Sequence, residues 1–362
     1  MTHSALQFLI PGELHSGTGG YVYDRRMIEG LRALGWQVTV HALDSSFPHP
    51  STAALAHAEH LLSKLTDGAL VLIDGLALGA MPELIETHAA RLAIAALVHM
   101  PLASEVGLAP LRAERLRQQE LRALQHVCQV IVTSRSSERL LRGQGLHRSS
   151  VSVVTPAADP ATLARRRYDE TLRLLCVATI NDGKGHELLI EALTPLAHLP
   201  WQLCCIGSLT RSPATVARVR ALLQRSGLEA RVALLGERPH QELPEHYSAS
   251  DLFVLATRHE SYCMAVAEAL AHGLPIISSR TGAIPELVGP HAGILVDPGD
   301  GAALHAALAR VLQQPALAQQ LADGALIARR RLKPWAASCA ELSAALATLQ
   351  KSMGASAREP AG

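Results

Sequence analysis

Short apolar runs alternate with longer amphipathic stretches through the first part of the chain. Alternation of this kind is typical of buried strands and covering helices in a doubly wound parallel sheet. The predicted strands are 6–10, 37–41, 69–73, 92–98, 130–133 and 151–154, and the predicted helices are 21–34, 51–65 and 103–126.

The same pattern restarts after Thr155-Pro156. The predicted strands are 172–178, 202–206, 232–235, 252–256 and 276–278, and the predicted helices are 186–196, 264–272 and 335–349. We therefore predict an α/β protein with two Rossmann-like domains, residues 1–155 and 156–334. A C-terminal helical segment over 335–353 and a disordered tail over 354–362 follow them.

Composition agrees with two aliphatic cores, since 362 residues are ample for two domains and 48% are apolar but only 3% aromatic. The net charge of +1 gives no sign of a nucleic-acid partner. No apolar run reaches the ~18 residues of a membrane span. The N-terminus lacks the basic region of a signal peptide, so we expect a cytoplasmic protein.

The six cysteines include no Cys-x-x-Cys pair. Cys176, Cys204 and Cys205 fall in predicted buried strands. We therefore expect reduced core thiols, and neither a disulfide set nor a metal site.

Two carboxylates, Glu260 and Glu268, flank the turn between a predicted strand and the next helix. Their spacing corresponds to roughly 12 Å of helical rise. Ligands of parallel α/β sheets bind at the carboxyl ends of the strands, where this turn lies. The plainer alternative is two carboxylates on a solvated helix surface.

The full motif resembles the donor-binding signature of retaining glycosyltransferases of family 4, which have the GT-B fold. It reads Glu-x7-Glu, then Ala271, Gly273 and Pro275, then residues 281–286. The resemblance implies two Rossmann-like domains facing across a cleft, with the last helix crossing back onto the first domain. It also implies a UDP- or GDP-sugar donor, an acceptor that is a small molecule, lipid or glycan, and no cofactor.

Lys184-Gly185 follows a predicted strand and opens a helix, where a cation adds to the helix dipole at a diphosphate. The family usually has Gly-Arg five residues earlier, and Ala178-Thr179 stand there instead. The missing arginine leaves Lys184 to carry more of the phosphate contact, or Arg211 or Arg238 to replace it. The plain alternative for each is an exposed cation.

Residues Ser261, Tyr262, Cys263 and Met264 lie where backbone N–H groups would contact the donor phosphates. Cys263 replaces a usual glycine, so its φ must be negative or strained. Its side chain either packs inward or lies beside the donor. The resemblance assigns ribose hydroxyls to Glu268 and hydroxyls of the transferred sugar to Glu260.

In the first domain, residues 12–21 form a glycine-rich loop that fits neither Gly-x-Gly-x-x-Gly nor a Walker loop, which argues against nicotinamide cofactors and ATP. The resemblance assigns Gly19 and Gly20 to the donor, and a simple tight turn is the alternative. His99 ends a buried strand, where the resemblance predicts contact with the transferred sugar; a structural histidine is the alternative. Glu105 opens the next predicted helix, and it either faces the acceptor or caps the helix.

The helix face over 111–122 is basic and amphipathic, but Glu114 and Glu120 dilute its charge. A solvated face is therefore favoured over a membrane-binding one. The sequence shows neither an Asp-x-Asp motif nor a His/Asp cluster, so transfer without a metal is expected.

Glu260 and Glu268 are better explained as hydroxyl ligands than as the carboxylate pair of a retaining glycosidase. Two rival functions stay open, a GT-B nucleotide-sugar epimerase or isomerase and a non-catalytic sugar-nucleotide binding module. Departures from the family pattern at Ala157, Thr179 and Cys263 favour the second rival.

Overall fold

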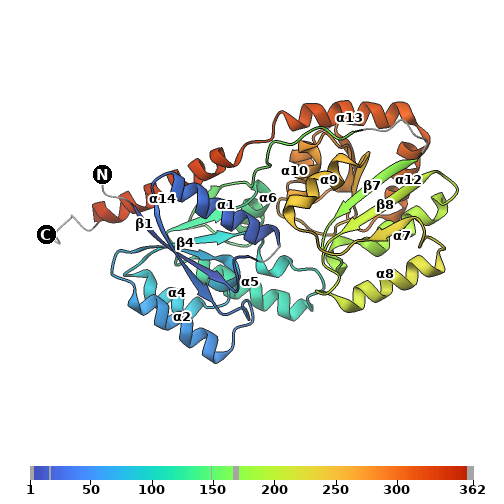
Figure 1. Ribbon diagram of the computed structural model, residues 1–362. Helices are drawn as coiled ribbons and strands as arrows, with labels where there is room; N and C mark the ends of the chain where they lie inside the picture. The colour runs from blue at the N-terminus through green and yellow to red at the C-terminus, as the bar shows by residue number, and fades with distance from the viewer. Residues whose placement is uncertain (1–3, 16–17, 148, 166–170, 357–362) are drawn as a thin grey trace. The chain divides into compact units, whose positions relative to one another are not determined.

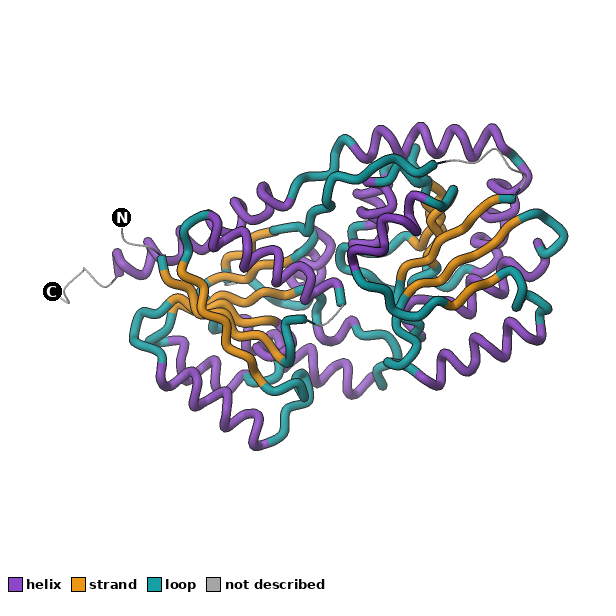
Figure 2. Tube along the Cα trace, in the orientation of Figure 1, coloured by secondary structure: helices purple, strands orange, loops and turns teal. Residues whose placement is uncertain are grey.

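The computed structural model describes residues 4–15, 18–147, 149–165 and 171–356. Its contacts divide the chain into two compact units, each built on a six-stranded sheet (Figures 1 and 2). The first unit is Met1–Pro156 with Trp335–Gly362, and the second is Ala157–Pro334. The division falls one residue after the boundary expected from the sequence.

The sheet of the first unit has the strand order β2-β1-β3-β4-β5-β6, and all its pairings are parallel. β3 and β4 are buried along their whole length, as expected for central strands covered on both faces. The strands are β1 (Ala5–Pro11), β2 (Gln37–Leu43), β3 (Leu70–Asp74), β4 (Ala93–Val98), β5 (Gln129–Val132) and β6 (Ser150–Val153).

Helices cover both faces of this sheet (Figure 2). They are α1 (Gly19–Ala33), α2 (Thr52–Lys64), α3 (Gly75–Leu78), α4 (Pro82–Ala89), α5 (Pro110–Leu124), α6 (Arg135–Gly143) and α14 (Trp335–Ser356), with a 3-10 turn η1 (Leu102–Ser104).

The C-terminal helix α14 packs along α1 within the first unit (Figure 1). Gly30 permits this contact, because a Cβ there would lie 2.1 Å from Cys339 Sγ. Trp36 Nε1 also donates to Ser343 Oγ at 2.8 Å. Of the predicted tail, residues 354–356 belong to α14, and 357–362 lie outside the described residues.

The helix predicted over 103–126 begins later than expected, at Pro110. Gly107 has a φ of 93°, which interrupts a helix, and Pro110 fits the first helical turn. Glu105 is therefore an exposed loop residue after η1, and the alternative that it caps the helix is wrong.

The sheet of the second unit has the order β12-β11-β10-β7-β8-β9, again with parallel pairing. Its strands are β7 (Leu172–Val177), β8 (Trp201–Ile206), β9 (Val232–Leu234), β10 (Leu252–Leu255), β11 (Ile276–Ser279) and β12 (Gly293–Val296). The sequence pattern missed β12, a short and half-buried edge strand between glycine and Asp-Pro.

Helices and 3-10 turns complete the second unit. They are η2 (Asp182–Lys184), α7 (His186–Leu193), η3 (Thr194–Leu196), α8 (Pro213–Arg225), η4 (His240–Glu242), α9 (Leu243–Ser248), α10 (Met264–Ala271), α11 (Ile284–Val288), α12 (Gly301–Gln313) and α13 (Pro315–Arg329). The core is mainly aliphatic, as expected from composition, with Trp201, Tyr247 and Phe253 among its largest buried side chains.

Within the described residues of both units, no helix combines the length and the apolar character needed to span a bilayer.

Candidate functional site

An ion pair lies at the carboxyl end of the second sheet. Lys184 follows β7 and Glu260 follows β10, its neighbour in the sheet. Lys184 Nζ donates to Glu260 Oε1 at 2.5 Å, across 76 residues of sequence. Burial alone would lower the pKa of Lys184, but Glu260 outweighs that effect and raises it. The lysine is therefore charged and is held by one carboxylate.

The loop that presents Lys184 needs the glycine that follows it. Gly185 has a φ of 67°, and a Cβ there would lie 2.0 Å from the carbonyl oxygen of Ala256. Asn181 Oδ1 accepts the backbone N–H of Lys184 at 3.1 Å and closes the turn. Through Gly185, this loop thus packs against the end of β10.

Cys263 keeps the backbone conformation of the glycine that it replaces. Its φ of 73° is the only positive value at a non-glycine position in the described parts of the chain. Of the two conformations that the sequence allowed, the strained one is observed. The side chain packs inward with the core of the second unit, and α10 begins at the next residue. The amides of Met264 and its neighbours therefore open a helix, as the sequence predicted.

The segment 281–283 braces the turn after Glu260. Gly282 has a φ of 58°, and a Cβ there would lie 2.1 Å from the carbonyl oxygen of Glu260. Ala283 N donates to Ser261 O at 3.0 Å. These contacts give the Thr281-Gly282-Ala283 part of the motif a structural role, which is to position Glu260 and Ser261.

Glu268 lies just past the first turn of α10 and is half-buried. Tyr247, at the end of α9, donates its hydroxyl to Glu268 Oε2 at 2.8 Å. Burial raises the pKa of Glu268, and the Tyr247 hydroxyl opposes that shift. Sequence reasoning missed Tyr247, because nothing near it in the sequence marks a fully buried tyrosine as an acid partner.

Two further donor candidates of this unit are Thr179 and Arg238. Thr179 follows β7 and is half-buried, and Gly207 packs against the backbone of residues 178 and 179. Arg238 is exposed on the loop after β9, and β8 separates that edge strand from β7. Arg211 is exposed as well. Lys184 is thus the cation that the fold brings to Glu260.

The first unit holds a different charged group, which is centred on His99. The ring follows β4, and its Nε2 lies 2.9 Å from Asp24 Oδ1 and 3.4 Å from Asp74 Oδ2. Both acids are almost fully buried. Burial alone would lower the pKa of His99, but the two carboxylates outweigh it and raise the pKa to about 10. His99 is therefore an imidazolium at neutral pH.

Backbone and aromatic contacts fix the His99 ring. Tyr23 meets it edge-on, with ring centroids 5.3 Å apart. Gly20 lies against the ring, since a Cβ there would be 3.4 Å from His99 Cδ2. Gly19 and Gly20 form the first turn of α1, and residues 16 and 17 of the predicted loop lie outside the described residues.

The sequence showed no His/Asp cluster, yet the fold assembles one from α1, β3 and β4. Two signals could have found the missed acids. Asp24 lies four residues before the buried Ile28, so helical spacing places it on the apolar face of α1. Asp74 ends a strand that is buried throughout.

The segment that holds the Lys184–Glu260 pair matches a known protein family. Residues 164–326 match the family model described as glycosyl transferases group 1. The matched segment lies within the second unit, which spans Ala157–Pro334. All the donor candidates between Thr179 and Glu268 lie within the matched segment, so the family match and the Lys184–Glu260 pair concern the same part of the chain.

A related sequence is the D-inositol 3-phosphate glycosyltransferase of Corynebacterium efficiens. The two are 30% identical over 205 residues, which is 54% of this chain and 48% of that protein. The chain thus spans about half the length of the curated relatives that it matches.

Solved structures resemble the whole chain. Sucrose-phosphate synthase from Thermosynechococcus elongatus has a TM-score of 0.82 at 20% identity and covers 97% of this chain and 100% of its own. HepE from Anabaena, in complex with UDP and glucose, has a TM-score of 0.75 at 17% identity and covers 96% of this chain and 100% of its own. The expected GT-B fold class is confirmed.

Proposed function

We propose that the protein is a retaining glycosyltransferase. It takes a sugar from a nucleotide-diphosphate donor, a UDP- or GDP-sugar, and transfers it to a small-molecule, lipid or glycan acceptor without a metal. The observation that carries this proposal is the Lys184–Glu260 pair inside the segment that matches the glycosyl transferases group 1 family.

Lys184 supplies the positive charge that a donor diphosphate requires. Its side chain is 29% exposed, whereas that of Glu260 is 10% exposed, so the ammonium is the member of the pair that an incoming anion can reach. A diphosphate competes with Glu260 for Nζ and, once bound, is stabilised by the amides that open α10. Glu260 can then accept hydrogen bonds from hydroxyls of the transferred sugar.

Glu268 and Tyr247 complete the donor side. Tyr247 orients the Glu268 carboxylate and leaves its other oxygen for the ribose hydroxyls. Glu260 is held by Lys184, so the two glutamates occupy distinct environments. That arrangement supports hydroxyl binding rather than the acid and nucleophile pair of a retaining glycosidase.

The reaction breaks the bond between the anomeric carbon and the phosphate oxygen, and the nucleoside diphosphate leaves with the electron pair. The acceptor oxygen bonds to the same face of that carbon, and its proton passes to the departing phosphate. Lys184 stabilises the charge that develops on the leaving group.

The names of similar proteins support this class of donor and acceptor. One relative is named for transfer to inositol 3-phosphate, and the HepE structure contains UDP and glucose. Glycosyl transfer is the reaction that accounts for both the family match and the paired charges.

The test is a panel of UDP-, GDP- and ADP-sugars with purified full-length protein, read by thermal shift and by release of nucleoside diphosphate. Binding stabilises the fold by mass action, which identifies the donor. Acceptors are then screened with that donor. We expect acceptor-dependent release that is unchanged after EDTA treatment and does not rise with Mg²⁺ or Mn²⁺.

Other outcomes would identify a rival function or overturn the metal-independent mechanism. Conversion of the donor without any acceptor indicates an epimerase. Donor binding with no release across the acceptor panel indicates a binding module. Activity that disappears with EDTA and returns with Mg²⁺ overturns the metal-independent mechanism.

A further inference from the structure

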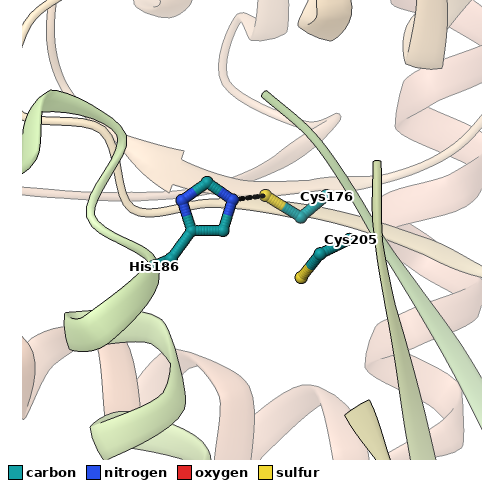
Figure 3. A group of neighbouring side chains, drawn as sticks. All are labelled: Cys176, His186 and Cys205. Carbon is teal, nitrogen blue, oxygen red and sulfur yellow. Dashed lines mark hydrogen bonds between the residues drawn. The ribbon is translucent and has the colours of Figure 1, made fainter. Parts of the chain in front are cut away.

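Three potential metal ligands meet in the core of the second unit. They are Cys176 on β7, Cys205 on β8 and His186 at the start of α7. One ligand atom from each lies within 4.8 Å of the other two, and all three residues are buried. Figure 3 shows both sulfur atoms on the side of the strands that faces the His186 ring.

The fold positions these side chains through two independent features. Cys176 and Cys205 are register partners in the parallel pair β7–β8, so their side chains emerge on the same face of the sheet. His186 directly follows Gly185, whose left-handed backbone packs against the carbonyl of Ala256. This contact fixes the position of His186. The loop that presents Lys184 therefore also positions the histidine of this cluster.

We propose that Cys176, Cys205 and His186 bind a thiophilic divalent cation, Zn²⁺. Thiolate and imidazole are the ligands that zinc prefers, and two Cys with one His are a known set of protein ligands for tetrahedral zinc. Two thiolates and a neutral imidazole around Zn²⁺ carry no net charge, which suits a site with no exposure to water.

The observed spacing agrees with this set. With Zn–S at about 2.3 Å and Zn–N at about 2.0–2.1 Å, a tetrahedral centre separates sulfur and nitrogen by about 3.5–3.6 Å. Cys176 Sγ lies 3.6 Å from His186 Nε2. That distance also permits a hydrogen bond between the thiol and the ring, so metal binding has to be tested directly.

The sequence predicted reduced core thiols without a metal site. The described cysteines are free, and the proposal departs from that prediction only in assigning a metal to two of them. The sequence could not show this site, because the ligands come from two strands and a helix without the spacing of a metal motif. Zinc there would tie the start of α7 to β7 and β8. Its ligands are buried in the core, so it is separate from the metal requirement of sugar transfer.

The experiment is a Co²⁺ titration of reduced, EDTA-treated and desalted full-length protein, followed by ultraviolet and visible absorption. Thiolate bound to Co²⁺ gives intense near-ultraviolet charge-transfer bands. We expect these bands to saturate at one equivalent and to disappear when Zn²⁺ is added. At a hundredfold excess over Kd, Zn²⁺ should raise the melting temperature by about 5–10 °C.

Matched serine variants locate the site. Cys176→Ser and Cys205→Ser should each lose most of the charge-transfer absorption. Cys204→Ser should keep the charge-transfer absorption. Cys204 directly precedes Cys205 on β8, so its side chain points to the opposite face of the sheet. The Asp24, Asp74 and His99 group has no sulfur, so Co²⁺ bound there adds no such bands.

The wild-type titration decides the proposal even if a serine variant fails to fold. Absence of thiolate–Co²⁺ absorption from the wild-type protein overturns it and leaves the 3.6 Å contact as a hydrogen bond. Absorption that persists in both Cys176→Ser and Cys205→Ser overturns it as well, because other thiols then hold the metal.

Discussion

Lys184 in the second unit and His99 in the first are both cations held by buried carboxylates, but they are held differently. Lys184 has one acid at 2.5 Å, and its side chain is 29% exposed. His99 has two acids, at 2.9 and 3.4 Å, whose side chains are 1% and 3% exposed. A single partner can be exchanged for an incoming anion, whereas two buried partners fix the charge of the ring.

The two buried ion pairs therefore serve different purposes. We propose that the Lys184–Glu260 pair undergoes ligand exchange, in which a diphosphate replaces the carboxylate at Nζ. In the His99 group, the two carboxylates raise the pKa of the imidazole and so favour its protonated form. Lys184→Ala and Asp24→Asn test the two sides of that contrast.

The largest effect is expected for Lys184→Ala. If Lys184 stabilises the leaving diphosphate, turnover should fall on the order of 10²–10³, the scale of losing one key electrostatic group. Steady-state release of nucleoside diphosphate measures it. Lys64→Ala, at the exposed end of α2, is the matched control and should keep normal turnover. A near-normal rate in Lys184→Ala would move the phosphate contact to another residue.

Glu120 shows what a buried acid does when a backbone amide, rather than a cation, is its partner. Both of its oxygens accept from Leu102 N, and burial raises its pKa to about 8 against a usual 4.5. A raised carboxyl pKa stabilises the fold below pH 4.5, and this contribution is lost as pH rises through about 8.

Glu120→Gln should therefore remove about 2–4 kcal/mol of the pH dependence of unfolding between pH 4.5 and about 8. Denaturant unfolding at several pH values measures this. Glu114→Gln, on the same helix but exposed, is the control. Identical pH slopes for Glu120→Gln and the wild type would show that Glu120 ionises without cost.

Asp24→Asn tests the fixed charge of His99. It should lower the free energy of unfolding near neutral pH by about 1–3 kcal/mol, the value of a hydrogen bond to a charged group. Because the pKa of His99 is raised, this contribution is complete below its usual 6.5 and is lost as pH rises through about 10.

The difference between Asp24→Asn and the wild type should thus shrink from pH 6.5 to about 10, and the NMR titration of His99 should move to lower pH. An unchanged His99 titration would mean that Asp74 alone holds the proton.

The smallest effect concerns the backbone beside Glu260. A non-glycine residue in the left-handed region costs roughly 1–2 kcal/mol. Cys263→Gly should relieve that strain and, after the loss of a small buried side chain, change stability by about 1 kcal/mol or less. Cys263→Ala keeps the strain and removes the thiol, so it should be less stable than Cys263→Gly. The reverse order would show that packing of the Cβ outweighs the strain.

The two charged groups also differ in how far the sequence predicts them. Lys184 and Glu260 each lie in a local motif at a strand end, and the parallel order of the sheet brings such ends together. His99 was predicted from its place after a buried strand, but its acids were not. Asp24 and Asp74 come from other elements, and only the packing of α1 against the sheet reveals them.

The fold shows the same division between local and non-local information. Long apolar runs predicted their strands well, because burial on both faces dominates their composition. The short edge strand β12 and the late start of α5 depend on weaker signals. Gly107 and Pro110 mark the loop before α5, and amphipathic periodicity alone extended the helix through them.

The central claim is that Lys184 contacts the donor diphosphate while Glu260 contacts the sugar. Calorimetric titration with the free nucleoside diphosphate of the preferred donor tests it directly, in the wild type, Lys184→Ala and Glu260→Gln. We predict about 10–100-fold weaker binding in Lys184→Ala, and binding at least as tight as wild type in Glu260→Gln, where Nζ loses its competitor. Equal affinity of Lys184→Ala and the wild type would contradict the claim.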